Sequence, residues 1–271
     1  MKSKYALRSL LGSAILAAAL LPSAAMNAQA AIAAPIPQAD YYLALGDSLT
    51  VGFQPDPAVS WTHGWVYQLR DMLAKTAPIE LTNLGHNGEC SDTFISGGLA
   101  KDCPTKDVDS PSQLAEATGF IGDHPGRVRL ITVEIGGNDL NGNRQLFLSS
   151  SADQQKAILA GIFPKLAQDW SIIFGSLRKA CPICEIIALN QYNPFPEGAT
   201  KADLATLFQT YTGLLRQATT PAHVRLADVY TPFVGHELAY TWMAKNNIHP
   251  NTTGYKVMAE IVARVVTAPV S

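Results

Sequence analysis

Short apolar runs bounded by turn residues alternate along the chain with longer segments in which apolar residues recur every three or four positions. The short runs predict buried β-strands, and the longer segments predict amphipathic helices. The predicted strands are 41–45, 79–84, 128–135, 185–189 and 224–228. Strands that alternate with helices are typical of a parallel sheet covered by helices, so the pattern predicts an α/β protein.

The longer segments place their apolar residues on one face of each predicted helix. In chain order these residues are Trp65, Leu69, Met72 and Leu73; Leu159, Ile162, Phe163, Leu166, Trp170, Ile173 and Leu177; Leu204, Leu207, Phe208, Tyr211 and Leu215; and Tyr255, Met258, Ile261, Val262 and Val265. Pro164 lies inside the second segment, so we expect it to break or kink that helix. No repeat or low-complexity linker divides the pattern, which indicates one domain over residues 31–271.

The first 30 residues have the pattern of a secretory signal peptide, with cations, an apolar run and a small-residue cleavage site. These features are Lys2, Lys4 and Arg8, residues 10–21, and Ala28-Gln29-Ala30. The apolar run is too short to span a bilayer, and no later segment approaches the length of a span. We therefore expect a protein without a stable membrane anchor that is secreted to the extracellular space or the periplasm.

The full chain has 271 residues, of which 47% are hydrophobic and 15% charged, and its formal net charge is −2. This is the composition of a globular protein, and it excludes a disordered chain. Residues 1–30 hold three of the 20 cations and none of the 22 acids, so the remaining 241 residues carry a net charge of −5. Because such a chain offers no basic surface for phosphates, nucleic acid is not an expected partner. We expect a monomer.

The four cysteines are expected to pair, because thiols of an exported protein meet an oxidising compartment. Three pairings are possible, and proximity along the chain favours Cys90 with Cys103 and Cys181 with Cys184. The spacing of Cys181 and Cys184 also occurs in redox pairs and zinc sites. A zinc site needs further ligands, and no second Cys-x-x-Cys or histidine pair supplies them, so we expect no metal.

Small and polar residues follow three of the predicted strands at the point where each strand ends. The three turns are Gly-Asp-Ser-Leu at 46–49, Gly-His-Asn-Gly-Glu at 85–89 and Gly-Gly-Asn-Asp at 136–139. Ligands of an open parallel sheet bind beyond the carboxyl ends of its strands. One such turn is more simply interpreted as a helix cap, but three in succession favour a functional site.

A serine in such a turn becomes a nucleophile only with a base in reach, and histidine is a natural candidate. His249 lies in a loop after the fifth strand and directly before the final helix, and His86 lies in the second turn. His249 is the leading candidate for the base, whereas His86 could line the pocket. The usual interpretation, a solvated or structural side chain, applies to the remaining histidines, which are His63, His124, His223 and His236.

These blocks, taken in order, resemble those of the SGNH, or GDSL-type, hydrolase and esterase family. The matching segments are 46–49, 83–89, 136–139 and 249–251, with Gly254-Tyr255. One short block would be weak evidence, but four in the family's order are specific. The resemblance implies a three-layer α/β/α sandwich with a flavodoxin-like, five-stranded parallel sheet.

By the same resemblance, Ser48 would attack an ester carbonyl and His249 would take the serine proton, which gives a covalent acyl-serine. The backbone N–H groups of Ser48 and Gly88 and the side-chain amide of Asn138 would form the oxyanion hole. No cofactor is implied. The expected partner is a small-molecule or lipid ester.

One position departs from the family pattern. The family usually places an aspartate three residues before the histidine, and this chain has Asn246 there. An amide oxygen can orient an imidazole, although it stabilises the imidazolium less than a carboxylate does. The alternatives for the group that orients His249, the third member beside Ser48 and His249, are Asp228, Glu237 or a main-chain carbonyl.

Three functions stay open at this point. The leading one is a secreted serine esterase or lipase that acts on acyl esters. A carbohydrate O-acetylesterase or an acyltransferase would use the same intermediate, and the missing aspartate leaves open a catalytically inactive binding domain. Aromatic residues are candidates for an acyl pocket, although so many aromatics are more typical of packing. They are Phe53, Trp61, Phe94, Phe147, Phe195 and Trp242.

Overall fold

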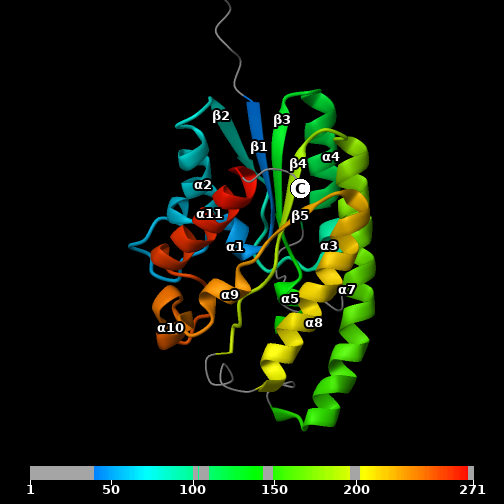
Figure 1. The fold of residues 1–271 in the computed structure, drawn as a ribbon, viewed down its shortest axis with the longest axis vertical. Coiled ribbons are helices and arrows are strands. Elements are labelled where there is room, and N and C mark those ends of the chain that lie inside the picture. Colours follow the sequence, from blue (N-terminus) through cyan, green and yellow to red (C-terminus); the bar gives the residue numbers. More distant parts are fainter. Residues whose placement is uncertain (1–39, 100–102, 104–109, 143–148, 196–201, 268–271) are drawn as a thin grey trace, which may run out of the picture. The chain divides into compact units, whose positions relative to one another are not determined.

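The computed structural model describes residues 40–99, 103, 110–142, 149–195 and 202–267; the predicted signal peptide and Phe147 lie outside these ranges. Five strands form one all-parallel sheet in the order β2-β1-β3-β4-β5 (Figure 1). The strands are β1 (Asp40–Gly46), β2 (Ile79–Asn83), β3 (Val128–Glu134), β4 (Glu185–Leu189) and β5 (Arg225–Ala227). This strand order is flavodoxin-like, so the predicted fold class is confirmed.

The sheet has a hydrophobic core on each face, because successive side chains of a strand point to opposite faces. In β1, Leu43 and Leu45 pack into one core while Tyr42 and Ala44 pack into the other. A strand that is buried on both faces has an almost continuous apolar sequence. For this reason the predicted strand ends lie within one residue of the observed ends.

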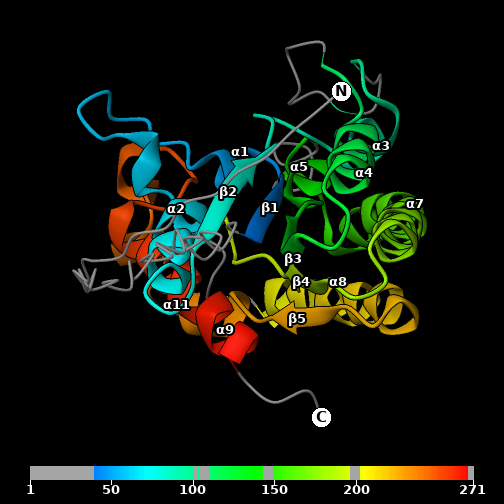
Figure 2. The same ribbon diagram turned by 90° about the horizontal axis from the view of Figure 1, so that it is seen from above.

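Helices cover both faces of the sheet (Figures 1 and 2). On one side lie α2 (Trp65–Leu73) and α11 (Thr252–Thr267), and on the other lie α3 (Ser91–Ser96), α4 (Gln113–Asp123), α7 (Ala152–Ala180) and α8 (Ala202–Thr219). The short elements are α1 (Ser48–Val51), α5 (Gly137–Asn141), α9 (Tyr230–Phe233), α10 (Glu237–Tyr240), and the 3-10 turns η1 (Trp61–His63), η3 (Thr220–Ala222) and η4 (Met243–Lys245). Most of these short elements lie in the connections that follow the strands.

The helix α7 differs from two expectations. It is 29 residues long and continues through Pro164, so of the expected break or kink, the break does not occur. Among the helices in the described ranges, α7 alone is long and apolar enough to cross a membrane, contrary to the expectation that no later segment reaches that length. However, Trp170, Ile173 and Leu177 of α7 are buried in the core. A core helix passes the same length test, so α7 is weak evidence for a membrane span.

The cysteines lie in the pairs that proximity along the chain favours. Cys90 and Cys103 have Cα atoms 5.8 Å apart, and those of Cys181 and Cys184 are 5.5 Å apart. Both separations suit a disulfide, and the structure joins each pair as one. Whether the protein forms these bonds in its own compartment stays a prediction.

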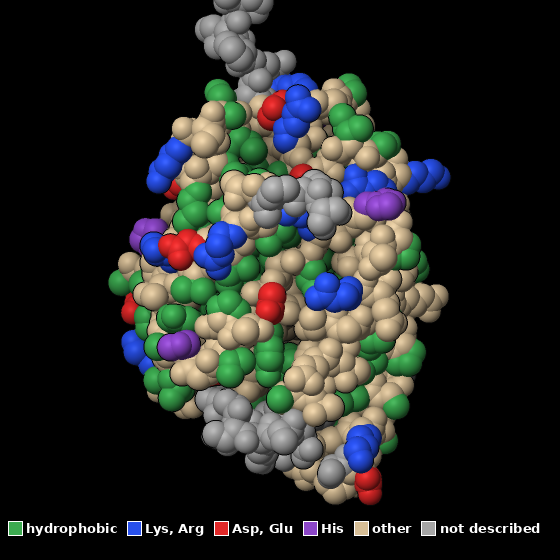
Figure 3. Space-filling model, viewed as in Figure 1, with side chains coloured by type: hydrophobic (Ala, Val, Ile, Leu, Met, Phe, Trp, Pro, Cys, Tyr) green, Lys and Arg blue, Asp and Glu red, His purple; other side chains and the backbone are tan. Residues whose placement is uncertain are grey.

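Charged side chains do not gather into a broad patch on the face shown in Figure 3. Lys and Arg side chains are scattered there among acidic, polar and apolar ones. This distribution fits the near balance of 20 cations and 22 acids in the whole chain.

Candidate active site

Ser48 begins the short helix α1 directly after β1. Asp47 caps this helix, because its side chain accepts the backbone N–H of Leu49 at 2.9 Å. The preceding residue, Gly46, has a φ of 147°, and a Cβ atom there would collide with the carbonyl oxygen of Glu134. Only glycine fits this position, so the chain turns sharply and presents Ser48 at the carboxyl edge of the sheet.

His249 lies in the loop between α10 and α11, and its Nε2 atom is 2.8 Å from the Oγ atom of Ser48. The backbone N–H of Trp242 donates to the carbonyl of His249 at 2.9 Å. The hydroxyl of Tyr192 donates to the carbonyl of Ile248 at 2.6 Å, which ties the loop to the end of β4. The fold therefore brings together the serine and the histidine that the sequence singled out.

The other imidazole nitrogen, Nδ1, lies 2.8 Å from the Oδ1 atom of Asn247. The same oxygen accepts the backbone N–H of His249 at 3.0 Å, which fixes the orientation of the amide group. Because an amide oxygen can only accept, Nδ1 must carry the proton in this arrangement. The Nε2 atom then presents its lone pair to the Ser48 hydroxyl, as a general base requires.

The position beside Nδ1 thus belongs to Asn247. None of the three residues proposed for it from the sequence, Asn246, Asp228 and Glu237, lies there. Asn246 has a left-handed backbone, with a φ of 58°, and ends η4. Asp228 accepts the side-chain amide of Asn190 at 2.9 Å and the backbone N–H of Thr231 at 3.2 Å, so it braces the start of α9. The signal in the sequence that could have identified Asn247 is its position two residues before His249, which is the spacing of an Asx turn.

Burial lowers the pKa of His249 to about 4. Its Nδ1 partner is a neutral amide, so no carboxylate counteracts the loss of solvation. The imidazole is therefore neutral near pH 7, the state in which it can accept a proton from serine. The same environment stabilises the imidazolium less than a carboxylate partner would.

Gly88 and Asn138 line the same cavity as Ser48 and His249. Gly88 has a φ of 72°, which favours glycine. The Nδ2 atom of Asn138 donates to a carboxylate oxygen of Asp47 at 3.2 Å and to a backbone carbonyl at 3.0 Å. These bonds hold the amide beside the serine turn, and an oxyanion would have to share one of its two hydrogens.

Asp139 braces the third turn. It accepts the backbone N–H of Ser91 at 3.0 Å and lies 2.6 Å from the Ser91 hydroxyl, which ties α5 to the start of α3. Burial raises the pKa of Asp139 to about 6. Its contacts are those of a structural brace.

Sequence reasoning missed three buried side chains that hold the serine turn: Gln113, Glu134 and Gln191. The Oε1 atom of Gln113 accepts the Gly46 N–H at 2.6 Å, and its Nε2 atom donates to the Gly46 carbonyl at 3.0 Å. Gln191 donates to the Glu134 carboxyl. Of the three residues, only Glu134 had a signal in the sequence, because it is a charged residue inside a strand that is predicted to be buried.

The cavity in front of Ser48 has a volume of about 510 Å³. Phe53 lines it and packs against the His249 ring, with ring centroids 4.5 Å apart. The acyl-pocket prediction is wrong for Phe94 and Phe195, which are buried in the core. The remaining described aromatics lie near Phe53: Trp61 packs against its ring at 5.3 Å, and Trp242 donates to Gln54 at 2.7 Å.

His86 does not contribute to the lining of this cavity. Its Nδ1 atom lies 2.8 Å from Glu89 and 3.2 Å from the hydroxyl of Ser110. Its neighbour Asn87 lines the cavity instead. His86 therefore braces the second turn.

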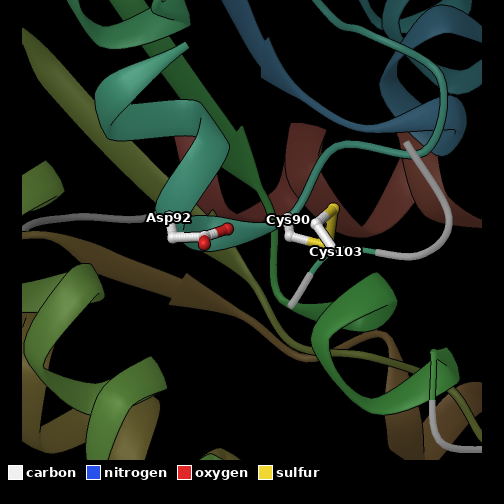
Figure 4. Close-up of side chains that lie close together, drawn as sticks. All are labelled: Cys90, Asp92 and Cys103. Carbon is white, nitrogen blue, oxygen red and sulfur yellow. A yellow bond between two sulfur atoms is a disulfide. The ribbon is translucent and has the colours of Figure 1, made fainter. Parts of the chain in front are cut away.

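One group of potential metal ligands occurs in the described part of the chain: Cys90, Asp92 and Cys103 (Figure 4). Their ligand atoms lie within 4.8 Å of one another. The two sulfurs are bonded to each other, and metals bind thiolates rather than disulfide sulfurs. In this state the group does not provide a metal site.

Comparisons with known proteins show which proteins this chain is similar to. The spore germination lipase LipC of Bacillus licheniformis is 25% identical over 233 residues, which cover 81% of this chain and 92% of the relative. The solved structure of the lipase Lip_vut3 from a goat rumen metagenome is similar with a TM-score of 0.64 and 21% identity, over 84% of this chain and 97% of that chain.

Axe2, an acetylxylan esterase from Geobacillus stearothermophilus, is similar with a TM-score of 0.56 and 16% identity, over 85% of this chain and 95% of that chain. At these identities the likeness to solved structures shows the fold alone. The GDSL-like lipase/acylhydrolase family matches residues 44–257, which include all four sequence blocks. This chain belongs to the GDSL-like lipase/acylhydrolase family.

Proposed function

We propose that this protein is an exported serine esterase or lipase that hydrolyses carboxylic esters through a covalent acyl-serine. The observation that carries the proposal is the connected chain of Ser48, His249 and Asn247, with two contacts of 2.8 Å at the edge of a cavity. Family membership supports ester hydrolysis as the class of reaction.

In the proposed reaction, the Ser48 Oγ atom attacks the ester carbonyl while its proton passes to the Nε2 atom of His249. The imidazolium keeps its Nδ1–H bonded to Asn247, and the backbone N–H groups of Ser48 and Gly88 with the Asn138 amide donate to the oxyanion. Nε2–H then protonates the leaving alcohol. Water, deprotonated by Nε2, finally releases the acid and restores the Ser48 hydroxyl.

Fluorophosphonate labelling tests this proposal directly, because the probe reacts with activated serines. We expect the wild-type protein to be labelled on Ser48 and both Ser48→Ala and His249→Ala to lose the label. Circular dichroism of each variant controls for folding. A folded wild-type protein that takes up no label and hydrolyses no ester would instead indicate an inactive binding domain.

A carbohydrate O-acetylesterase, or an acyltransferase with the same intermediate, is the second candidate. The amide side chains of Asn87, Asn141 and Gln191 on the cavity wall favour it, because amides bond well to sugar hydroxyls. Rates on acetyl and long-chain esters, with and without an acceptor alcohol, would separate the candidates. Preference for a long acyl chain supports the lipase.

Export is part of the same proposal. It is supported by the signal-peptide pattern of residues 1–30 and by the proximity of the cysteines in each pair.

A further inference from the structure

We infer that the buried carboxyl groups of Asp47 and Glu134 share one proton, and that Glu134 is thereby a positioning residue for the serine turn. Glu134 would act through Asp47 and would not touch the substrate. The inference rests on the proposed function, to which it adds a residue outside the sequence blocks.

Glu134 ends β3 and is 0% exposed, while Asp47 is 3% exposed. One carboxyl oxygen of Glu134, Oε1, accepts the side-chain amide of Gln191. The other, Oε2, is buried, and no N–H or O–H group of the described residues donates to it. The two residues are adjacent across the sheet edge, because the backbone N–H of Asp47 donates to the backbone carbonyl of Glu134 at 3.2 Å. Their electrostatic interaction includes a hydrogen bond between the two carboxyl groups.

Two carboxylates in contact and away from water cannot both be ionised at low cost. Burial, followed by the charge of Asp47, raises the pKa of Glu134 well above its usual range. Burial also raises the pKa of Asp47, but only to about 6, because the hydrogen bonds from Glu134 and Leu49 oppose it. The proton therefore lies on Glu134, whose Oε2–H donates to Asp47 and is no longer without a partner.

The surroundings of the pair also favour one proton. In the described ranges no Lys, Arg or His forms an ion pair with either carboxyl. Among the described residues, the titratable groups that interact with the pair include two acids and three tyrosines, namely Glu89 before α3, Asp139 of α5, Tyr192 after β4, Tyr211 of α8 and Tyr255 of α11. A second negative charge would meet no compensating cation there.

The pair is placed to position the reactive groups. Asp47 accepts the Leu49 N–H with Oδ1 and the Asn138 amide with Oδ2, so one carboxylate orients both the start of the serine helix and a predicted oxyanion donor. A donor from Glu134 holds this carboxylate in place without removing its charge. Loss of the donor would leave Asp47 buried, charged and free to rotate away from both partners.

The substitutions Glu134→Gln and Glu134→Leu test the inference. Glutamine keeps an oxygen for Gln191 and an N–H for Asp47, whereas leucine has a similar volume and no donor. We expect kcat to stay within about threefold in Glu134→Gln and to fall about tenfold or more in Glu134→Leu, with Ser48 labelling slowed in the same ratio. Equal rates in the two folded variants, whether high or low, would overturn the inference.

Two measurements detect the shared proton without any substrate. Because a folded Glu134 keeps a proton that the unfolded chain loses near pH 4.3, the wild-type stability must fall as pH rises from there toward the raised folded pKa. The Tm of Glu134→Gln relative to wild type should therefore increase between pH 4.5 and pH 8.

The infrared C=O band of a protonated carboxyl should also be present in the wild type at pH 7 and absent in Glu134→Gln. A Tm difference that is constant with pH, together with no such band, would contradict the shared proton. A wild-type protein that is folded but never labelled would refute the proposed function and the positioning role of Glu134. The Tm comparison and the infrared band would still show whether the two carboxyl groups share one proton.

Discussion

Asn247 lies beside Nδ1 of His249, in the place that a carboxylate has in a Ser-His-Asp triad. Its Oδ1 atom accepts two hydrogen bonds from the same histidine, one from the backbone and one from the ring. This arrangement orients the imidazole and selects its tautomer, but it adds no charge to stabilise the imidazolium. Burial, which no neighbouring carboxylate offsets, lowers the pKa of His249 to about 4, far below the usual value for histidine.

Asn247→Asp should raise the pKa of His249, because a nearby negative charge favours the imidazolium. Activity requires the neutral imidazole, so kcat/KM of the wild type should fall with decreasing pH only near the pKa of about 4. In Asn247→Asp this acid limb should move upward by about one pH unit or more. A pH profile of kcat/KM on a soluble ester measures the shift.

Asn246→Asp is the matched control, since it adds the same charge one residue earlier and aspartate tolerates the left-handed backbone there. Its acid limb should stay near that of the wild type. Asn247→Ala removes the acceptor and should lower kcat by about 100-fold. An acid limb that moves equally in both aspartate variants would contradict the assignment of Asn247.

At the scale of elements, the site consists of three turns at adjacent strand ends, each fixed by a short helix or a buried side chain. The second turn is followed at once by Cys90, which precedes α3 and pairs with Cys103 (Figure 4). Gly88 lies two residues before Cys90. A disulfide here would therefore restrain the turn that carries Gly88. The pair Cys181–Cys184 lies instead between the end of α7 and the start of β4.

Replacing both members of the first pair, as Cys90→Ala with Cys103→Ala, should lower the free energy of unfolding by about 3 kcal/mol. The reason is that a bond between residues 13 apart restricts the unfolded chain. The same double change should also lower kcat, because Gly88 loses its restraint. Urea unfolding and ester kinetics measure the two effects.

The pair Cys181 and Cys184 provides the control, since its residues are only 3 apart and lie at the opposite edge of the sheet. Its double alanine variant should lose about 2 kcal/mol of stability and keep its kcat. Free thiols in denatured, unreduced wild-type protein would show that the disulfides are absent. Unchanged kinetics of the variant with Cys90→Ala and Cys103→Ala would contradict the idea that this disulfide restrains Gly88.

At the scale of the whole molecule, one sheet edge gathers residues from nearly the full length of the described chain, from Ser48 to His249. The family match, at 44–257, starts well after the predicted signal peptide. All described residues of the site follow Asp40 in the chain. This organisation is compatible with removal of the predicted signal peptide.

The full chain, expressed in a bacterial host that exports proteins, should give a mature product of 241 residues that begins at Ala31. The reason is that a signal peptidase cleaves after small residues such as Ala28-Gln29-Ala30. Intact mass and N-terminal sequencing of the exported protein measure the cleavage site. Replacing both alanines by phenylalanine should block cleavage, and an uncleaved wild-type chain outside the cytoplasm would contradict the prediction.

The sequence by itself determined the strands, the helical faces and the turn that carries Ser48. Strand β4 was located at its observed ends because four of its five residues are apolar and buried, as is typical of a strand that is covered on both faces. The serine turn was recognisable because glycine and a capping aspartate act on their immediate neighbours. Features of this kind depend on local chemistry, so they can be predicted from residues that are adjacent in the sequence.

Only the tertiary structure decided the partners of these groups. Gln113 bonds Gly46 across 67 positions, and Gln191 bonds Glu134 across 57. Asn247 rather than Asn246 faces the imidazole because a left-handed residue at the end of η4 redirects the loop. Hydrogen-bond partners depend on distances across the sheet and on the path of loops, and these distances exist only once the chain is folded.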